Sequence, residues 1–432
     1  MKKRSIFLFW CVLILCVILG SSIVLAETKL SLWGGYPEMV PFYEKVAKDY
    51  QESHPDVEVG ILAFNLRDFE QKLSATIPTD TVADIVEIST YAMRKFIEAG
   101  FIPSNPPDID AMLKGGSYSQ FAINNLTYGD HTFGIPLFRG RQVMFWNKKM
   151  FAEAGLTRAP KNWDEVIDYS QKLAQYDEQG NLTRSGISLR LSGAGSGVAE
   201  KWWFWLYPAG GSILEEYPDG KYRAGYDNEA GREALKLYID LVYKYHVDDH
   251  KVKHDSEAFA LGVTAMFIRE SWVVGYMQQY APQVEYDTAP LPSDKRPGNY
   301  ENFVHNLHIT RTCKNPEVAC DFIKFMLQPE YQKYLFETVG WAPARDDVDY
   351  SAVYEKIPQY RSFLEVPENF EFFGYEPIVC GDEIMTRLAE RLVDNFLDQS
   401  LVDNPEGIAR VIHEAAEETN NILKENELYH EE

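Results

Sequence analysis

The sequence predicts an α/β protein divided into two lobes. Short strand patterns alternate with helical patterns, an order typical of βαβ units around a parallel sheet. The chain has 432 residues, of which 45% are hydrophobic and 25% charged, which is the balance of a globular protein rather than a disordered one. Because single hydrophobic cores stop growing at about 250–300 residues, a chain of this length is expected to form two.

The N-terminal segment, 1–26, is predicted to be a secretory signal peptide. A basic segment (2–4) precedes an uninterrupted apolar run (6–19), and small residues occupy the −3 and −1 positions of a cleavage site before Glu27. An uncleaved membrane anchor is the alternative, although the run is short for a membrane span. We therefore expect an exported protein in the periplasm or at the cell exterior, with membrane association left open.

Three strand–helix pairs are predicted in the next part of the chain. Apolar and polar residues alternate in the strands, and Pro41 suits the first turn of a helix whose apolar residues share one face. The predicted elements are strands at 30–33, 57–64 and 83–89 and helices at 41–50, 66–77 and 91–99. In such sheets ligands bind beyond the carboxyl ends of the strands, so residues at or after these ends are site candidates.

A second region begins near residue 140. Asn162 and Glu165 form a capping box, and Asn-Pro pairs at 315 and 404 suit the starts of two later helices. A glycine-rich segment at 192–197 lacks the ending of a phosphate-binding loop and is interpreted as a flexible connection. Further predicted elements are helices at 228–245 and 316–327 and a strand at 304–310.

The charge and cysteine content exclude several function classes. With 42 Lys and Arg against 65 Asp and Glu, the net charge is −23, and so acidic a surface repels nucleic acid. Cys313, Cys320 and Cys380 allow one disulfide whose pairing the sequence leaves open. The chain has no C-x-x-C pair, so a structural zinc site has no support. We expect no metal and no cofactor.

Several segments together resemble the extracellular solute-binding proteins (family 1) of carbohydrate ABC importers. The resemblance spans roughly residues 27–350, and it rests on the order and spacing of the segments rather than on any single motif. These segments are 30–35, 133–136, 143–156, 160–165, 262–266 with Trp272, 320–326 and 340–345.

The resemblance implies a type II-like periplasmic-binding-protein fold. Each lobe would be a mostly parallel sheet flanked by helices, with a sugar held in the cleft between the lobes. The expected lobes are 27–140 plus 302–340 and 141–301 plus 341–432. The expected hinge crossings lie near 138–142, 298–303 and 340–346.

Sugar sites need flat apolar faces for the rings and polar groups for the hydroxyls. The candidate ligand contacts come from the family motifs, the hinge crossings and the strand ends. The alternative for each residue is a structural role, either in core packing or in a surface ion pair. One tryptophan of the 202/203/205 cluster is expected to reach the cleft, and Trp202 represents it. The candidate ligand contacts are Trp33, Asn65, Glu87, Tyr91, Arg139, Arg141, Trp202, Trp272, His305, Asn306, Trp341 and Arg345.

The resemblance implies a non-enzymatic, monomeric binding protein. It would capture a saccharide by hinge closure and deliver it to the permease subunits of an ABC transporter. An alternative is a binding protein for a different solute, such as a uronate, a polyol phosphate or a polyamine; the arginines favour an anionic ligand and the aromatic residues favour a sugar. A secreted glycan hydrolase is the third possibility, and it would need two carboxylates about 5–9.5 Å apart.

Overall fold

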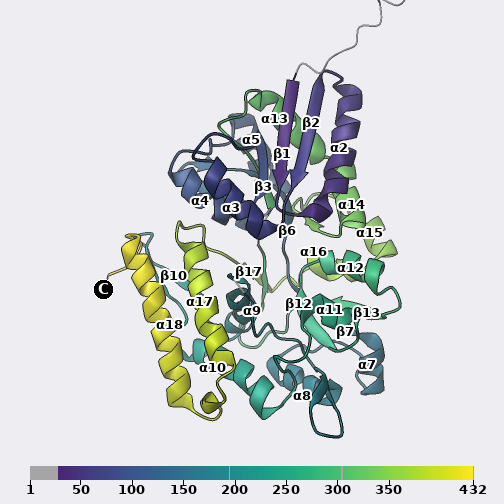
Figure 1. Ribbon diagram of the computed structural model, residues 1–432, viewed down its shortest axis with the longest axis vertical. Coiled ribbons are helices and arrows are strands. Elements are labelled where there is room, and N and C mark those ends of the chain that lie inside the picture. Colours follow the sequence, from purple (N-terminus) through teal and green to yellow (C-terminus); the bar gives the residue numbers. More distant parts are fainter. Residues whose placement is uncertain (1–27, 194, 303–304, 432) are drawn as a thin grey trace, which may run out of the picture.

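The computed structural model describes residues 28–193, 195–302 and 305–431 and shows two α/β lobes stacked along the long axis (Figure 1). The predicted signal peptide, 1–26, lies outside the described residues. Across the described ranges, the structure contains no helix that is both long and apolar enough to cross a membrane. Cys313, Cys320 and Cys380 are free thiols. The two-lobed α/β class predicted from the sequence is confirmed.

The first lobe, at the top of Figure 1, is built around strands β1 to β3 and their helices. Its elements are β1 (Thr28–Gly34), η1 (Pro37–Met39), α2 (Val40–Ser53), β2 (Val57–Ala63), α3 (Leu66–Thr76), β3 (Ile85–Ile88), α4 (Thr90–Glu98), α5 (Pro107–Met112), η2 (Leu113–Ser117), α6 (Gln120–Leu126), β4 (Thr127–Tyr128), β5 (His131–Thr132), β6 (Ile135–Arg139), β15 (His305–Ile309), α13 (Pro316–Met326), α14 (Pro329–Thr338) and β16 (Ala342–Pro343).

Alternating side chains place a hydrophobic core on each face of this lobe's sheet. Leu30 and Leu32 point to the face covered by α2 and α13, whereas Val86 and Ile88 point to the face covered by α3 and α4. The side chain of Ser89 accepts a hydrogen bond from the Ala92 amide and so begins α4 at the end of β3. The strands and helices predicted here by periodicity are therefore confirmed.

The sequence predicts mostly parallel sheets, but the structure contains both parallel and antiparallel strand pairs. In the described residues the first sheet has the order β16-β6-β15-β3-β1-β2, in which β1 pairs in parallel with β2 and β3. By contrast, β15 is antiparallel to both β3 and β6, because β6 leaves the lobe towards the crossing and β15 returns from it. In the second lobe β7 lies between β12 and β13 and is antiparallel to both.

The second lobe combines this small sheet with a helical region that ends in the two long helices at the lower left of Figure 1. Its elements are β7 (Val143–Asn147), α7 (Lys148–Glu153), α8 (Trp163–Leu173), β8 (Gln175–Tyr176), β9 (Leu182–Arg184), α9 (Gly197–Leu206), β10 (Leu214–Glu216), β11 (Tyr222–Ala224), α10 (Glu229–Ile239), η3 (Asp240–Lys244), α11 (Asp255–Ala260), β12 (Met266–Arg269), α12 (Trp272–Tyr280), β13 (Tyr286–Ala289), β14 (Gly298–Tyr300), α15 (Ser351–Lys356), η4 (Pro358–Tyr360), α16 (Arg361–Leu364), β17 (Glu371–Phe373), α17 (Gly381–Phe396), η5 (Gln399–Leu401) and α18 (Pro405–Glu425).

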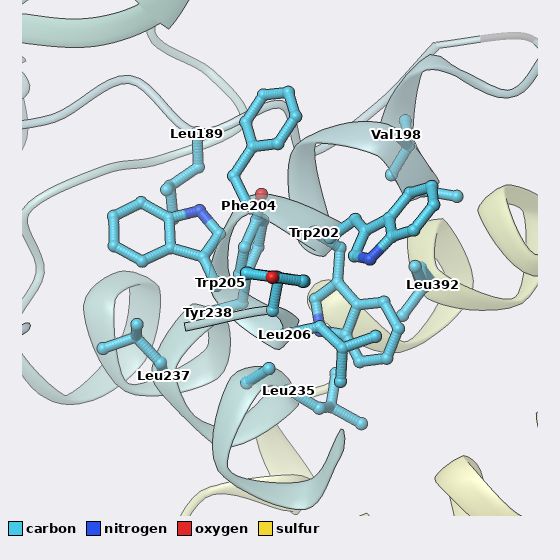
Figure 2. Close-up of a cluster of buried hydrophobic side chains, with 14 of the residues drawn as sticks. Leu189, Val198, Trp202, Phe204, Trp205, Leu206, Leu235, Leu237, Tyr238 and Leu392 are labelled. Atoms are coloured by element: carbon cyan, nitrogen blue, oxygen red, sulfur yellow. The ribbon is translucent and has the colours of Figure 1, made fainter. Parts of the chain in front are cut away.

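Helix α9 lies at the centre of this lobe's hydrophobic core. Figure 2 shows Trp202 and Trp205 packed among apolar side chains from α10 and α17, such as Leu235 and Leu392. Both tryptophans are fully buried, because a helix surrounded by other helices needs apolar residues on nearly all of its sides.

Three chain segments run side by side where the lobes meet. The Gly140 amide donates to the Asn302 carbonyl (2.7 Å), which joins the first segment to the second. Strand β16 pairs with the end of β6, with Ala342 opposite Arg139, which joins the third segment to the first. We propose that these segments are the hinge between the lobes, close to the three crossings expected from the sequence.

Candidate functional site

A pocket of about 1080 Å³, open to solvent, lies between the lobes. Its size suits a small-molecule site. Its walls come from the first lobe, from the crossing segments and from the second lobe. The lining residues are Tyr36, Glu38, Leu66, Arg67, Ser89, Tyr91, Gly140, Gln142, Arg190, Ser196, Gly197, Glu200, Arg269, Glu270, Trp272, Tyr300, Asn302 and Trp341.

Aromatic rings from both lobes line this pocket. Tyr36, which follows β1, packs edge-to-face on Trp341 with ring centroids 5.8 Å apart. Tyr91, at the start of α4, stacks on Tyr375 of the second lobe at 4.5 Å and nearly parallel. Trp272 begins α12 of the second lobe and also packs against the first lobe's core. The pocket thus offers aromatic surface from two bodies joined by a hinge.

Glu270 organises the polar groups on the second lobe's wall. It accepts hydrogen bonds from Trp272 Nε1 (3.2 Å), from Arg269 Nη1 (2.9 Å) and from the side-chain amide of Gln142. Burial alone would raise its pKa, but the positive charges of Arg269 and Lys201 and the bond from Gln142 lower the pKa to about 2. Glu270 is therefore a carboxylate that fixes the orientation of Trp272.

Charged side chains of both signs line the pocket. Two of the arginines already have carboxylate partners outside the lining set, since Arg67 pairs with Glu70 (2.7 Å) and Arg269 with Asp255 (2.8 Å). Three arginines and three glutamates line the pocket: Arg67, Arg190, Arg269, Glu38, Glu200 and Glu270. Because carboxylates outside the lining already pair with two of the guanidinium groups, an anionic solute is disfavoured, and the remaining groups suit the hydroxyls of a neutral solute. Among the described residues no cluster of three or more His, Cys, Asp and Glu side chains is placed to hold a metal ion.

Three of the sequence candidates, Tyr91, Trp272 and Trp341, line the pocket. Three others lie buried beneath its first-lobe wall. Glu87 forms a hydrogen bond with His305 Nδ1, and the His305 ring stacks on Phe138 and contacts Trp341 at 4.8 Å. The side-chain amide of Asn306 donates to Thr90 Oγ1 (2.8 Å). These residues support the aromatic wall from behind.

The two arginines expected in the cleft are instead buried at the hinge. Arg139 donates to the carbonyl groups of Pro343 and Ala344 and pairs with Asp346 (2.8 Å). Arg141 pairs with Glu301, donates to the Phe363 carbonyl (3.0 Å) and lies 4.4 Å from the centre of the Phe372 ring. Their guanidinium groups are therefore engaged by protein acceptors.

Four further candidates lie away from the pocket. Trp33 packs against Phe64 on the α3 side of the sheet, with the ammonium of Lys72 4.6 Å from its ring centre. Asn65 is exposed at the start of α3, and Trp202 is fully buried in the second lobe's core. Arg345 pairs with Asp347 (2.6 Å) and donates to the Leu327 carbonyl (2.8 Å).

Several lining residues were not selected from the sequence. Tyr36 comes directly after the strand-ending glycines and Gln142 directly after a selected arginine, so their positions carried a signal. Tyr300 and Asn302 lie inside a predicted crossing, 298–303. Glu200 sits on α9 beside the buried tryptophans and accepts a hydrogen bond from Tyr375 (2.8 Å), a contact invisible in the sequence.

Replacing Glu87 tests the protonation state of the buried Glu87–His305 pair. Burial raises the pKa of Glu87 and lowers that of His305, so both are expected to be neutral, with the acid donating to Nδ1. Glu87→Gln, whose amide can donate in the same way, should change the free energy of unfolding by less than about 1 kcal/mol. Glu87→Ala leaves the imidazole unsatisfied and should cost about 1–3 kcal/mol or more.

Urea unfolding at pH 7 measures both variants. Equal and large losses for Glu87→Gln and Glu87→Ala would contradict the neutral pair and indicate a buried carboxylate facing an imidazolium.

Two α/β lobes, three adjacent crossings and a pocket between the lobes define a hinged binding protein. The sequence model of the bacterial extracellular solute-binding proteins matches residues 45–362, which is more than half of the chain. The protein belongs to this family.

The relatives that follow are distant in sequence but similar over most of their length. The chain is 22% identical over 413 residues to a protein of Brucella abortus described as a binding protein, covering 94% of this chain and 95% of that one. It is 22% identical to the diacetylchitobiose binding protein DasA of Streptomyces coelicolor over 335 residues, 74% of each chain. Among solved structures, an ABC transporter solute-binding protein from Thermotoga lettingae with bound α-D-tagatose superposes with a TM-score of 0.76 at 22% identity, covering 92% of this chain and 100% of that one.

Proposed function

We propose that the protein captures a saccharide in the interlobe pocket and delivers it to the permease subunits of an ABC importer. One observation carries the proposal: a single pocket takes aromatic rings and hydrogen-bonding groups from both lobes and from the hinge. In this proposal the signal peptide is cleaved after residue 26, and the mature protein acts outside the cytoplasm as a monomer. It catalyses no reaction.

The chemistry of the pocket supports a saccharide. The apolar faces of sugar rings pack on aromatic side chains, and their hydroxyls need polar groups of both kinds, donors and acceptors. The aromatic faces come from Tyr36, Tyr91, Trp272 and Trp341. The hydrogen-bond donors and acceptors come from Gln142 and the charged side chains of the lining. The names of the Streptomyces relative and the Thermotoga structure, which refer to diacetylchitobiose and tagatose, agree with this class of ligand.

A ligand that touches both lobes favours the closed arrangement over the open one. It can do so only by the difference between its affinities for the two states, so contacts on both walls are required. Trp341 belongs to the first lobe's core, whereas Arg190 and Glu200 line the pocket from the second lobe, and a sugar that contacts both sides would supply that difference. The permease would then recognise the closed surface.

The proposal predicts that a saccharide stabilises the protein and is recovered intact. The mature protein would be heated with neutral mono-, di- and oligosaccharides and with matching uronates. A ligand at 100 times its Kd should raise the free energy of unfolding by about 2.7 kcal/mol. Chromatography of the same mixtures should recover the sugar unchanged.

Three results would contradict the proposal. If no saccharide raised the melting temperature, the ligand class would be wrong. A uronate that stabilised while its neutral counterpart did not would favour an anionic solute, and product formed in proportion to protein would indicate a hydrolase.

A further inference from the structure

A row of three aromatic side chains runs along α12 from the pocket to the molecular surface. Trp272 stands at the first position of the helix and lines the pocket, and Tyr276 and Tyr280 follow at intervals of four residues. Residues four apart lie on the same face of a helix. The ring centroids are 6.1 Å apart from Trp272 to Tyr276 and 4.9 Å apart from Tyr276 to Tyr280.

The exposure of this row increases away from the pocket. Val273, Val274 and Met277 are fully buried and anchor α12 by another face. Trp272 and Tyr276 are partly buried, whereas Tyr280 is 62% exposed. Tyr276 and Tyr280 thus present two adjacent rings next to Trp272, and aromatic rings are surfaces on which the apolar faces of sugars pack.

Polar and charged groups accompany the row. The Arg269 guanidinium lies 5.2 Å from the centre of the Trp272 ring and is held by Asp255 (2.8 Å), the first residue of α11. Next to α11, Lys253 pairs with Glu257, and both charges lie close enough to Tyr276 to act on its pKa, which burial raises. Aromatic faces edged by donors and acceptors thus continue beyond the pocket.

We propose that the aromatic row on α12 extends the binding site and holds the later rings of an oligosaccharide whose first rings occupy the pocket. The inference rests on the proposed function and deepens it, because it assigns the ligand to the oligosaccharides. A helix rises about 6 Å in four residues, which suits successive rings of a sugar chain. The occupant is identified by continuity, since Trp272 belongs both to the pocket and to the row.

A length series of one saccharide tests the extension. Calorimetry would first identify the shortest member that binds the wild type. It would then measure the affinities of the homologues that are longer by one to three rings. We expect wild-type affinity to rise with length. In Tyr280→Ala the affinity for the longer members should fall about two- to tenfold, while the shortest binds as before. Tyr280→Phe should keep the rise, because stacking needs the ring. Tyr276→Ala should lower the affinity for the members one ring longer.

The control is Tyr128→Ala, which removes a 40% exposed tyrosine from the first lobe and should change no affinity. The inference is overturned if the rise with length survives Tyr280→Ala and Tyr276→Ala, or if affinity does not depend on length. In either case a short saccharide that still needs Trp272 would leave the proposed function standing. If no saccharide binds the wild type, both fail together.

Discussion

Replacing Trp272 by alanine is expected to weaken saccharide binding roughly 5- to 150-fold. A sugar ring packed on an indole buries apolar surface worth on the order of 1–3 kcal/mol, which corresponds to that loss of affinity. The indole is held ready, because its Nε1 donates to the Glu270 carboxylate (3.2 Å) and the side chain begins α12 at the pocket wall. The fold should lose less, since Trp272 is only partly buried.

Trp33→Ala is the matched control. The same change of side chain is made at another partly buried tryptophan, which packs against Phe64 and Lys72 and does not line the pocket. Calorimetry should show normal saccharide affinity for Trp33→Ala and a large loss for Trp272→Ala, each measured below its melting temperature. Equal affinities in the two variants would remove Trp272 from the site.

Replacing Glu301 is expected to have the largest effect on stability. Its carboxylate is fully buried between the Arg141 guanidinium, which it contacts directly, and Arg139, whose Nη1 is 3.6 Å from Oε1. Glu301→Gln would remove the carboxylate that both buried guanidinium groups face, while Arg139 would keep its ion pair with Asp346. Removing one partner of a buried ion pair costs about 3–5 kcal/mol, because the charge left behind is desolvated and unpaired.

Urea unfolding of Glu301→Gln beside Glu58→Gln measures this effect. Glu58 also pairs with a cation, Lys29 at 3.0 Å, but both side chains are more than half exposed, so its loss should cost at most about 1 kcal/mol. Similar, small losses of unfolding free energy in the two variants would show that the buried ion pairs of Glu301 stabilise the fold no more than an exposed ion pair does.

The elements of the fold could be predicted from the sequence because each has a clear local pattern. Leu30 and Leu32 alternate in β1, and Asn404 with Pro405 begins α18, as the periodicity and the capping residues indicate. The direction of β15 could not be predicted in this way. A strand that enters a sheet from another lobe takes its direction from the crossing, and no local pattern records it.

The site could be predicted only to within a few residues. Strand ends indicated the correct edge of the sheet, but Glu87 lies inside β3 and points into the core, whereas Tyr91, after the strand, reaches the pocket. Arg139 and Arg141 are candidates in the sequence because they follow the Gly-Ile-Pro segment of the family resemblance, at an expected crossing. Their partners, Asp346 and Glu301, lie 207 and 160 residues away in sequence, so only the folded chain shows that they are engaged.

The structure of the protein in complex with a saccharide that stabilises it tests the central claim most directly. The proposed function predicts sugar rings in the interlobe pocket, with one ring in contact with Trp272 of the second lobe and with Trp341 or Tyr36 of the first. A saccharide held by one lobe alone, or bound outside this pocket, would contradict it.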